Sequence, residues 1–349
     1  MKYRGVVYDV GLHFAADSPS VEPFDPKLVA HDLKVIATDL TANAVRIEGD
    51  SIQRLVAASR IAHSLGLAVF FNPWKMHAPA DEVRAYLAEA AEAAENLRGE
   101  GLDIVFVSQC EYTIFNEGIF LGKDLMERVK WMSEQMKETP EGPSMPDLLR
   151  EACSKLNDIL KSFLQVIRPF FHGRVTYSAG MWEVGDWTLF DIVGIDHYRQ
   201  GESESDYLKG LHRYRCEKPI SVMEFGCCAY EGAAALGAGG FMLLRGTNPD
   251  GTGSFAGDVV PKYSETEQAD YVEAIIKILA RAEVDAMFVY VFSFPTYRTG
   301  EGMRNLDMIS FSLVKTWPET DERSKAIPLW APKEAFRRVA TAYKQLESS

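Results

Sequence analysis

The sequence predicts a closed (β/α)8 barrel, a TIM barrel, that forms a single domain over residues 1–349. Three observations favour this fold. Eight short runs rich in β-branched or aromatic residues alternate with helical patterns along the chain. These runs are almost continuously apolar, as in parallel strands that are buried on both faces. A chain of 349 residues also suits one barrel, since such barrels reach this size as one domain.

The expected strands follow one another in chain order, each as a short apolar run before a connection. "RGVVYDV" and "LAVFFNP" show the pattern, because branched and aromatic residues dominate them. The eight strands are expected at residues 4–10, 42–49, 67–73, 103–111, 174–180, 191–199, 219–226 and 286–295. An open doubly wound sheet is the alternative. Its first turn would be glycine-rich, and "YDVGLHFAADS" is not.

Helix signals separate most of these strands. Asp25 is expected to cap the first helix, with Pro26 in its first turn, and Gly66 to end the second. Ser264 and Glu267 are expected to form a capping box. Helical stretches are expected at 25–40, 51–66, 80–101, 147–170, 205–216, 264–283 and from about residue 332.

Three connections differ from a plain turn. The helical region after the fourth strand is expected to break near "TPEGPSMP", residues 139–146. Residues 228–262 and 296–330 are longer than a βα loop needs. Long loops of this kind are often functional, so we expect these two to act as lids or as walls for a substrate.

The composition excludes several classes of function. The formal net charge of -13 disfavours a phosphate backbone as partner, so we expect no nucleic-acid binding. No segment is apolar enough for a signal peptide or a membrane span, which predicts a cytoplasmic protein that does not bind a membrane. The five cysteines are an odd number without disulfide spacing, as expected of reduced thiols.

Motifs for metals and cofactors are also missing from the sequence. The seven histidines show no HxH or HExxH spacing, so we expect no metal. "GIFLGKD" and "GAGG" do not have the pattern of a phosphate-binding loop, and we expect no cofactor. The oligomeric state is not indicated by any pattern.

Polar and aromatic residues gather where the expected strands end, which is where barrel enzymes carry their active sites. They are Arg46, Glu48, Asn72, Trp74, Glu111, Asp196, His197, Tyr198, Glu224, Phe294 and Tyr297. Glu224 follows the apolar run "ISVM", and a carboxylate buried there without a partner would be costly. It therefore has either a structural partner, for which Arg46 is the candidate, or a catalytic task.

Three segments resemble those of clan A glycoside hydrolases, the retaining group that includes cellulase- and mannanase-like families. "PISVMEFG" (219–226) resembles their strand-7 nucleophile motif, "VRIEG" (45–49) their strand-2 arginine segment, and "GIDHYR" (194–199) their strand-6 segment. The resemblance covers most of the chain as a spacing pattern. It implies that Glu224 is a nucleophile held by Arg46 and Tyr198, with His197 in a supporting role.

The stretch "VSQCEYTIFNEGIF" (107–120) contains two candidates for the acid/base, Glu111 and Glu117. Glu111 falls at the end of the strand, whereas Glu117 lies roughly 10–20 Å further along the chain. The resemblance also selects Glu111, because the family ends this strand with Asn-Glu. The chain is further similar to bacterial barrels sometimes labelled "abortive infection protein", which have "SELTLF" at this place and again indicate the earlier glutamate.

Cys110 departs from the family pattern, which has asparagine before the acid/base. That asparagine bonds to the sugar 2-hydroxyl, and a thiol is too weak a donor to replace it. The substrate would then present its 2-hydroxyl differently, or the activity would be altered or absent.

The resemblance implies a retaining glycoside hydrolase or transglycosidase acting on a carbohydrate. Glu224 would attack the anomeric carbon while Glu111 protonates the leaving oxygen, from strands expected on opposite sides of the barrel with carboxyls about 5 Å apart. The expected substrate-binding residues are Asn72, Trp74, Cys110, Trp182 and Phe294. Two alternatives stay open: a catalytically silent carbohydrate-binding barrel, and a barrel lyase or isomerase that uses the same glutamates.

Overall fold

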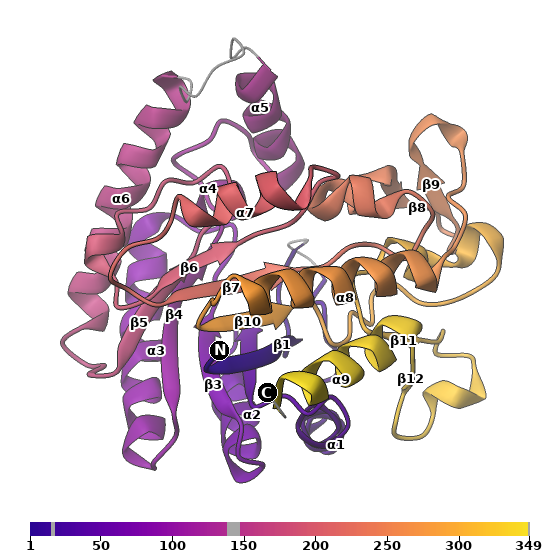
Figure 1. Ribbon diagram of the computed structural model, residues 1–349, viewed down its shortest axis with the longest axis horizontal. Helices are drawn as coiled ribbons and strands as arrows, with labels where there is room; N and C mark the ends of the chain where they lie inside the picture. The colour runs from indigo at the N-terminus through magenta and orange to yellow at the C-terminus, as the bar shows by residue number, and fades with distance from the viewer. Residues whose placement is uncertain (15–17, 138–146, 348–349) are drawn as a thin grey trace.

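The computed structural model describes residues 1–14, 18–137 and 147–347. Eight parallel strands form its central sheet in the order β5-β4-β3-β2-β1-β10-β7-β6 (Figure 1). They are β1 Tyr3–Asp9, β2 Ala44–Gly49, β3 Ala68–Pro73, β4 Ile104–Cys110, β5 Arg174–Ser178, β6 Val193–Asp196, β7 Ile220–Phe225 and β10 Ala286–Val289. Each falls on one of the eight predicted segments, so the predicted (β/α)8 barrel is confirmed.

The barrel is nearly closed where β5 meets β6. No continuous ladder joins these two strands within the described chain, but a parallel bridge pairs Ala179 with Ile195. Ala179 donates to the Gly194 carbonyl at 3.1 Å, and Asp196 donates back to the Ala179 carbonyl at 2.8 Å. An open doubly wound sheet would leave these edges apart, so this seam excludes the alternative topology.

Helices cover the outside of the barrel. They are α1 Pro26–Thr38, α2 Ile52–Ser64, α3 Ala80–Gly99, α4 Tyr112–Phe115, α5 Leu125–Lys137, α6 Asp147–Ile167, α7 Glu204–His212, α8 Glu265–Arg281 and α9 Glu334–Glu347. The Asp25 carboxylate accepts a hydrogen bond from the Lys27 N–H, and Pro26 occupies the first turn, as predicted. Gly66 follows the second helix with φ +77°, which suits glycine. The break predicted at 139–146 lies outside the described residues.

The predicted capping box of α8 is only half formed. Ser264 accepts from the Glu267 N–H at 3.2 Å, as predicted. The Glu267 carboxylate does not return the bond, because it accepts from the N–H groups of Gly232 and Ala234, both at 3.2 Å. The Ser264 N–H donates to Ala229 instead. The predicted hydrogen bond from the Ser264 N–H to the Glu267 carboxylate was wrong, because the loop after β7 offers this carboxylate other donors.

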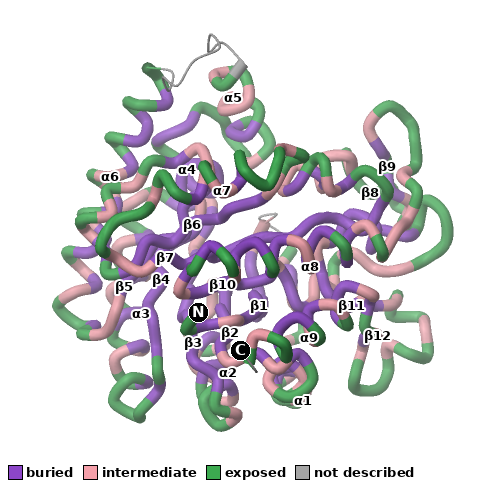
Figure 2. Tube along the Cα trace, viewed as in Figure 1, coloured by how far each residue is buried: buried purple, intermediate pink, exposed green. Residues whose placement is uncertain are grey.

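Apolar side chains fill both the barrel and the layer between the barrel and its helices. Tyr3, Val7, Phe70 and Phe288 belong to the inner cluster, and a larger cluster lies under the helices. Figure 2 shows the strands as buried and the outer faces of helices and hairpins as exposed. Tyr343 of α9 donates to the Gly5 carbonyl at 2.6 Å, which fixes the last helix to the first strand.

The two long loops contain short elements of their own. Residues 228–262 carry the antiparallel pair β8 Leu244–Thr247 and β9 Gly253–Phe255. The later loop leads into β11 Val314–Thr316 and β12 Trp330–Pro332, and both pairs extend on the same side of the view in Figure 1. Their roles as lids or walls stay a prediction.

Hydrogen bonds join these loops to each other. Ala229 donates to the Met308 carbonyl at 2.9 Å, and the Cys228 thiol donates to the Ile309 carbonyl at 3.0 Å. A buried ion pair of 3.2 Å between Lys333 and Asp307 lies beside them. The two loops are therefore hydrogen-bonded to each other.

Two further properties concern the chain as a whole. The five cysteines are free, and four of them are buried while Cys216 is exposed. Within the described ranges, no helix combines the length and the apolar character needed to cross a bilayer.

We expect Gly194→Ala to destabilise the barrel at its seam. A Cβ at this position would overlap the Tyr177 carbonyl and lie 2.6 Å from the Thr176 hydroxyl. Overpacking of this kind costs about 1–3 kcal/mol, which urea unfolding measures. Gly239→Ala is the matched control, because no atom lies within 4 Å of its added Cβ. Equal stability of the two variants would contradict the proposed closure.

Candidate active site

A β-bulge on β7 aims Glu224 into the barrel. Val222 and Glu224 pair with consecutive residues of β6, Ile195 and Asp196, so Met223 is an additional residue. The pairing with β10 also gains one residue in β7 at this point. Side chains alternate between the faces of a strand, and Met223 packs inside the barrel. Without the bulge, Glu224 would point outward.

A second bulge does the same for β4. Cys110 lies three positions after Val107, whereas Ser178 on β5 lies two positions after Thr176, the partner of Val107. Val107 faces the barrel interior, so the additional residue brings Cys110 to the inner face as well. In both strands, the alternation of inward and outward side chains therefore shifts by one residue just before the site.

Arg46 of β2 is the centre of the polar cluster. Its guanidinium donates to Glu224 Oε1 at 2.8 Å and to the Met223 carbonyl at 3.1 Å, and it is fully buried. Asn72 Oδ1 accepts from Arg46 Nε at 2.9 Å and so orients the side chain. The Arg46–Glu224 pair suits a structural glutamate as well as a nucleophile, so the pair alone does not decide the role.

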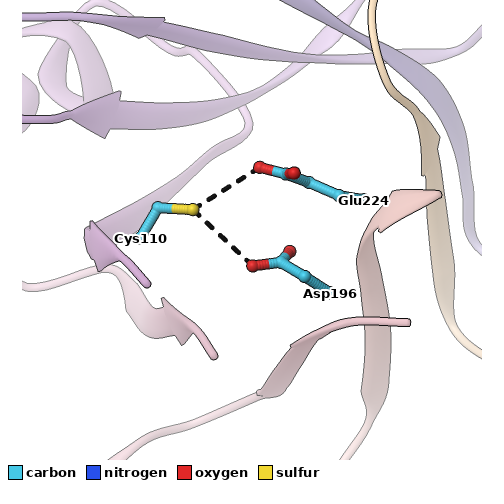
Figure 3. A group of neighbouring side chains, drawn as sticks. All are labelled: Cys110, Asp196 and Glu224. Atoms are coloured by element: carbon cyan, nitrogen blue, oxygen red, sulfur yellow. Dashed lines mark hydrogen bonds between the residues drawn. The ribbon is translucent and has the colours of Figure 1, made fainter. Parts of the chain in front are cut away.

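Cys110, Asp196 and Glu224 point toward one another (Figure 3). The Cys110 sulfur lies 3.4 Å from Glu224 Oε1 and 3.6 Å from Asp196 Oδ2. Ser178 donates to Asp196 Oδ1 at 2.7 Å, and Tyr198 donates to Glu224 Oε2 at 2.9 Å. Burial, followed by the charges of Asp196 and Glu224, raises the pKa of the Cys110 thiol well above its usual value, so the thiol keeps its proton.

Glu111 follows Cys110 at the mouth of β4. Its backbone is left-handed, with φ +40°, a conformation that non-glycine residues rarely adopt outside functional or strained sites. Its half-buried carboxylate has no hydrogen bond or ion pair to the described part of the chain. Burial, then the charges of Asp196, Glu224 and Glu183, raise its pKa well above the usual value. A raised pKa favours the protonated form, which a general acid requires.

Glu183 holds the segment that follows Glu111. Its buried carboxylate accepts from the Thr113 N–H and hydroxyl at 3.0 and 2.7 Å, from the Tyr177 hydroxyl at 2.8 Å, and from the Gly180 N–H at 3.1 Å. Tyr177 in turn accepts from the Tyr112 N–H at 2.8 Å. Four hydrogen bonds to one carboxylate thus fix the start of α4 against β5.

Asn116 and Glu117 have a different environment. Asn116 is buried, where it accepts from the Ala78 N–H and donates to the Lys75 carbonyl. It ties the loop after β3 to the loop after β4. The side chain of Glu117 is exposed.

Two of the predicted aromatic residues are partly accessible, and one is not. Trp182 is half-buried and donates to the Thr113 hydroxyl, and Phe294 is half-buried beside Phe14 and Tyr297. Trp74 is only 2% exposed and packs beside Phe115 and Arg46. Stacking of these rings on a sugar stays a prediction.

His197 faces away from the carboxylates. Its ring packs on Tyr207 of α7 and donates from Nε2 to the Tyr207 carbonyl at 3.0 Å. Burial lowers its pKa, which favours the neutral ring. Its backbone N–H donates to the Glu224 carbonyl, so its support of the site is structural.

The sequence assigned no role to two carboxylates of this cluster, Glu48 and Asp196, although both end strands. Glu48 is two residues after Arg46 on β2 and shares a face of the strand with it. Its fully buried carboxylate lies 3.4 Å from Arg46 Nη2. Burial raises the pKa of both carboxyl groups well above the usual value. The alternation in "VRIEG" was the available signal for Glu48, because residues i and i+2 share a face. Asp9 of β1 pairs with Glu48 of β2, and burial raises the pKa of Asp9 to about 6.

The ring order corrects one geometric expectation. β5 and β6 lie between β4 and β7 on the short way round the barrel. The two strands are therefore three positions apart and not opposite. The separation of about 5 Å between the Glu111 and Glu224 carboxyls stays a prediction.

Solved structures of glycoside hydrolases share this architecture. A GH113 β-1,4-mannanase matches with a TM-score of 0.59 at 15% identity, covering 99% of each chain. The GH113 β-mannanase AaManA from Alicyclobacillus acidocaldarius gives 0.53 at 15%, covering 99% of this chain and 98% of that one. PbGH5A, a glycoside hydrolase family 5 enzyme from Prevotella bryantii, gives 0.52 at 11%, covering 97% and 96%. This chain has the clan A glycoside hydrolase fold.

Other comparisons add nothing to this result. No protein-family model matches the sequence, and the search of curated proteins gives no match. None of the three structures named above carries the label "abortive infection protein", so that resemblance gains no support.

We expect Arg46→Met to destabilise the protein strongly. Removing one partner of a buried ion pair costs about 3–5 kcal/mol, because the charges left behind are uncompensated. The loss should be smaller at acidic pH, since Glu48 and Asp196 then bind protons and no longer need the guanidinium. Urea unfolding at neutral and acidic pH measures both effects.

The control is Arg323→Met, which removes an exposed pair with Asp321 and should leave stability unchanged at either pH. A loss in Arg46→Met that grows on acidification would contradict the assigned role of Arg46.

Proposed function

We propose that this protein is a retaining glycosidase in which Glu224 is the nucleophile and Glu111 the acid/base. The observation that carries the proposal is the contrast between two carboxyl groups at the ends of β4 and β7. Glu224 is fixed by an arginine and a tyrosine, whereas the Glu111 carboxyl is unbonded and its pKa is raised. Retaining glycosidases need this division between an ionised and a protonated carboxyl.

The environment of Glu224 supports its role as nucleophile. Arg46 and Tyr198 each donate to a different carboxylate oxygen, at 2.8 and 2.9 Å. These two donors hold the carboxylate in one orientation, as an attack on the anomeric carbon requires. Glu224 attacks the anomeric carbon, the glycosidic oxygen leaves with the Glu111 proton, and a glycosyl-enzyme ester forms. Water or an acceptor hydroxyl, deprotonated by Glu111, then attacks the ester and frees Glu224.

Cys110 supports a second candidate, a carbohydrate-binding barrel without activity. The thiol contacts Glu224, where an amide in the resembled family would bond to the sugar. A thiol is a weak donor, so the transition state loses one stabilising interaction. The active glycosidase and the inactive carbohydrate-binding barrel predict different results in covalent labelling.

We expect 2-deoxy-2-fluoroglycosides with activated leaving groups to label Glu224. The fluorine slows hydrolysis of the glycosyl-enzyme, so the adduct accumulates and peptide mass spectrometry locates it. The structures that share this fold include β-1,4-mannanases, a β-glucosidase and β-glucuronidases, so mannosyl, glucosyl and glucuronyl reagents form the first panel. Glu224→Gln should give no adduct, and Glu231→Gln, on the exposed rim, should label normally. No adduct in the folded protein with any sugar supports the silent barrel.

We expect Glu111→Gln to lower turnover of poor leaving groups by about 10²–10⁴-fold, the usual contribution of a general acid. Activated aryl glycosides should still form the glycosyl-enzyme, because they leave without a proton. The raised pKa of Glu111 moves the loss of its proton to higher pH, so wild-type kcat/KM should fall as pH rises above that pKa. Glu111→Gln should lose this alkaline limb.

Glu117→Gln is the matched control, since Glu117 is six residues away and exposed. It should keep the wild-type rate and pH profile. The opposite result, with Glu117 essential and Glu111 dispensable, would assign the acid/base to the later glutamate.

A further inference from the structure

We propose that Cys110, Asp196 and Glu224 form a binding site for a thiophilic divalent cation such as Zn²⁺. Their ligand atoms lie within 4.8 Å of one another, and no other group of three such side chains does so in the described chain. The site goes beyond glycoside cleavage and does not depend on it. Sequence motifs do not indicate it, because its ligands come from three separate strands.

The distances fit tetrahedral coordination. With Zn–S of about 2.3 Å and Zn–O of about 2.0–2.2 Å, a tetrahedral angle separates sulfur from oxygen by about 3.5–3.7 Å. The Cys110 sulfur lies 3.4 Å from Glu224 Oε1 and 3.6 Å from Asp196 Oδ2. All three side chains point to a common centre (Figure 3), so a cation binds there without large movements.

The number of hydrogen-bond donors among the three groups also favours a cation. A thiol carries one hydrogen, and here it faces two carboxylate oxygens. Sulfur can donate this hydrogen to only one of the two oxygens, so the thiol alone does not satisfy both contacts. A cation between the three atoms satisfies both contacts at once.

A buried carboxylate that has an ion pair but no hydrogen bond provides an independent observation. Glu48 is fully buried, and neither of its carboxylate oxygens has a hydrogen-bond partner. It faces the same guanidinium as Glu224 and Asp196, at 3.4 Å from Arg46 Nη2. Within the described residues, Arg46 is the one cation that forms ion pairs with these three carboxylates. Three carboxyl groups therefore share one guanidinium, and a divalent cation would supply a second positive charge beside them.

Arg46 and the cation can share Glu224. A carboxylate oxygen has two lone pairs, so Oε1 can accept from Arg46 and also coordinate the metal. Sulfur binds as thiolate, so the thiol proton leaves to solvent as the metal–sulfur bond forms. Since Glu224 is also the proposed nucleophile, bound metal and glycosyl transfer exclude each other.

Titration with Co²⁺ tests the site directly, because a cobalt–thiolate bond gives charge-transfer absorption in the near ultraviolet. Wild-type protein should show this band, and excess Zn²⁺ should remove it by displacement. Cys110→Ser should lose the band, and Asp196→Asn should bind cobalt more than about tenfold more weakly. The band reports coordination whether or not any glycoside is cleaved.

Cys153→Ser and Cys216→Ser are controls for the other thiols, and both should keep the band. The Asp196→Asn amide oxygen still accepts from Ser178, so this variant tests the site even if Cys110→Ser fails to fold. The proposal is overturned if folded wild-type protein shows no band, if the band persists in Cys110→Ser, or if Asp196→Asn binds cobalt as tightly as wild type.

Discussion

The site depends on one buried positive charge. Arg46 lies among Glu48, Asp196 and Glu224, and it donates directly to the last of these. A buried carboxylate is tolerated when it is paired and hydrogen-bonded, and otherwise it binds a proton. Arg46 donates to Glu224 at 2.8 Å, whereas Glu48 and Asp196 lie farther from the guanidinium and have raised pKa values. One guanidinium thus pairs with three carboxyl groups at different distances.

Irregular backbone makes this cluster possible. Regular strands send alternate residues to opposite faces, and Met223 and Val107 already occupy the inner face. One additional residue on each strand adds Glu224 and Cys110 to the same face. Bulges next to active sites commonly re-aim a side chain in this way. The left-handed backbone of Glu111 then turns the chain at the mouth of β4.

Cys110 separates this barrel chemically from the family it resembles. A buried thiol between two carboxylates is a poor donor to a sugar but a good ligand for a soft cation. The nearby Glu183 carboxylate is fully hydrogen-bonded. The Cys110 thiol, in contrast, has one hydrogen for two carboxylate oxygens. The same substitution therefore weakens one expected interaction and supplies a ligand for another.

The sequence by itself determined the eight strands, most helix starts and the positions of Arg46, Tyr198 and Glu224 near strand ends. Apolar runs, N-caps and strand periodicity are local properties, so they are readable from neighbouring residues. Only the tertiary structure decided the meeting of Cys110, Asp196 and Glu224, the partners of Glu267 and the burial of Trp74. These depend on bulge positions and on contacts between residues far apart in the chain. A one-residue change in strand phase reverses the face of a side chain, and no local pattern here encodes that change.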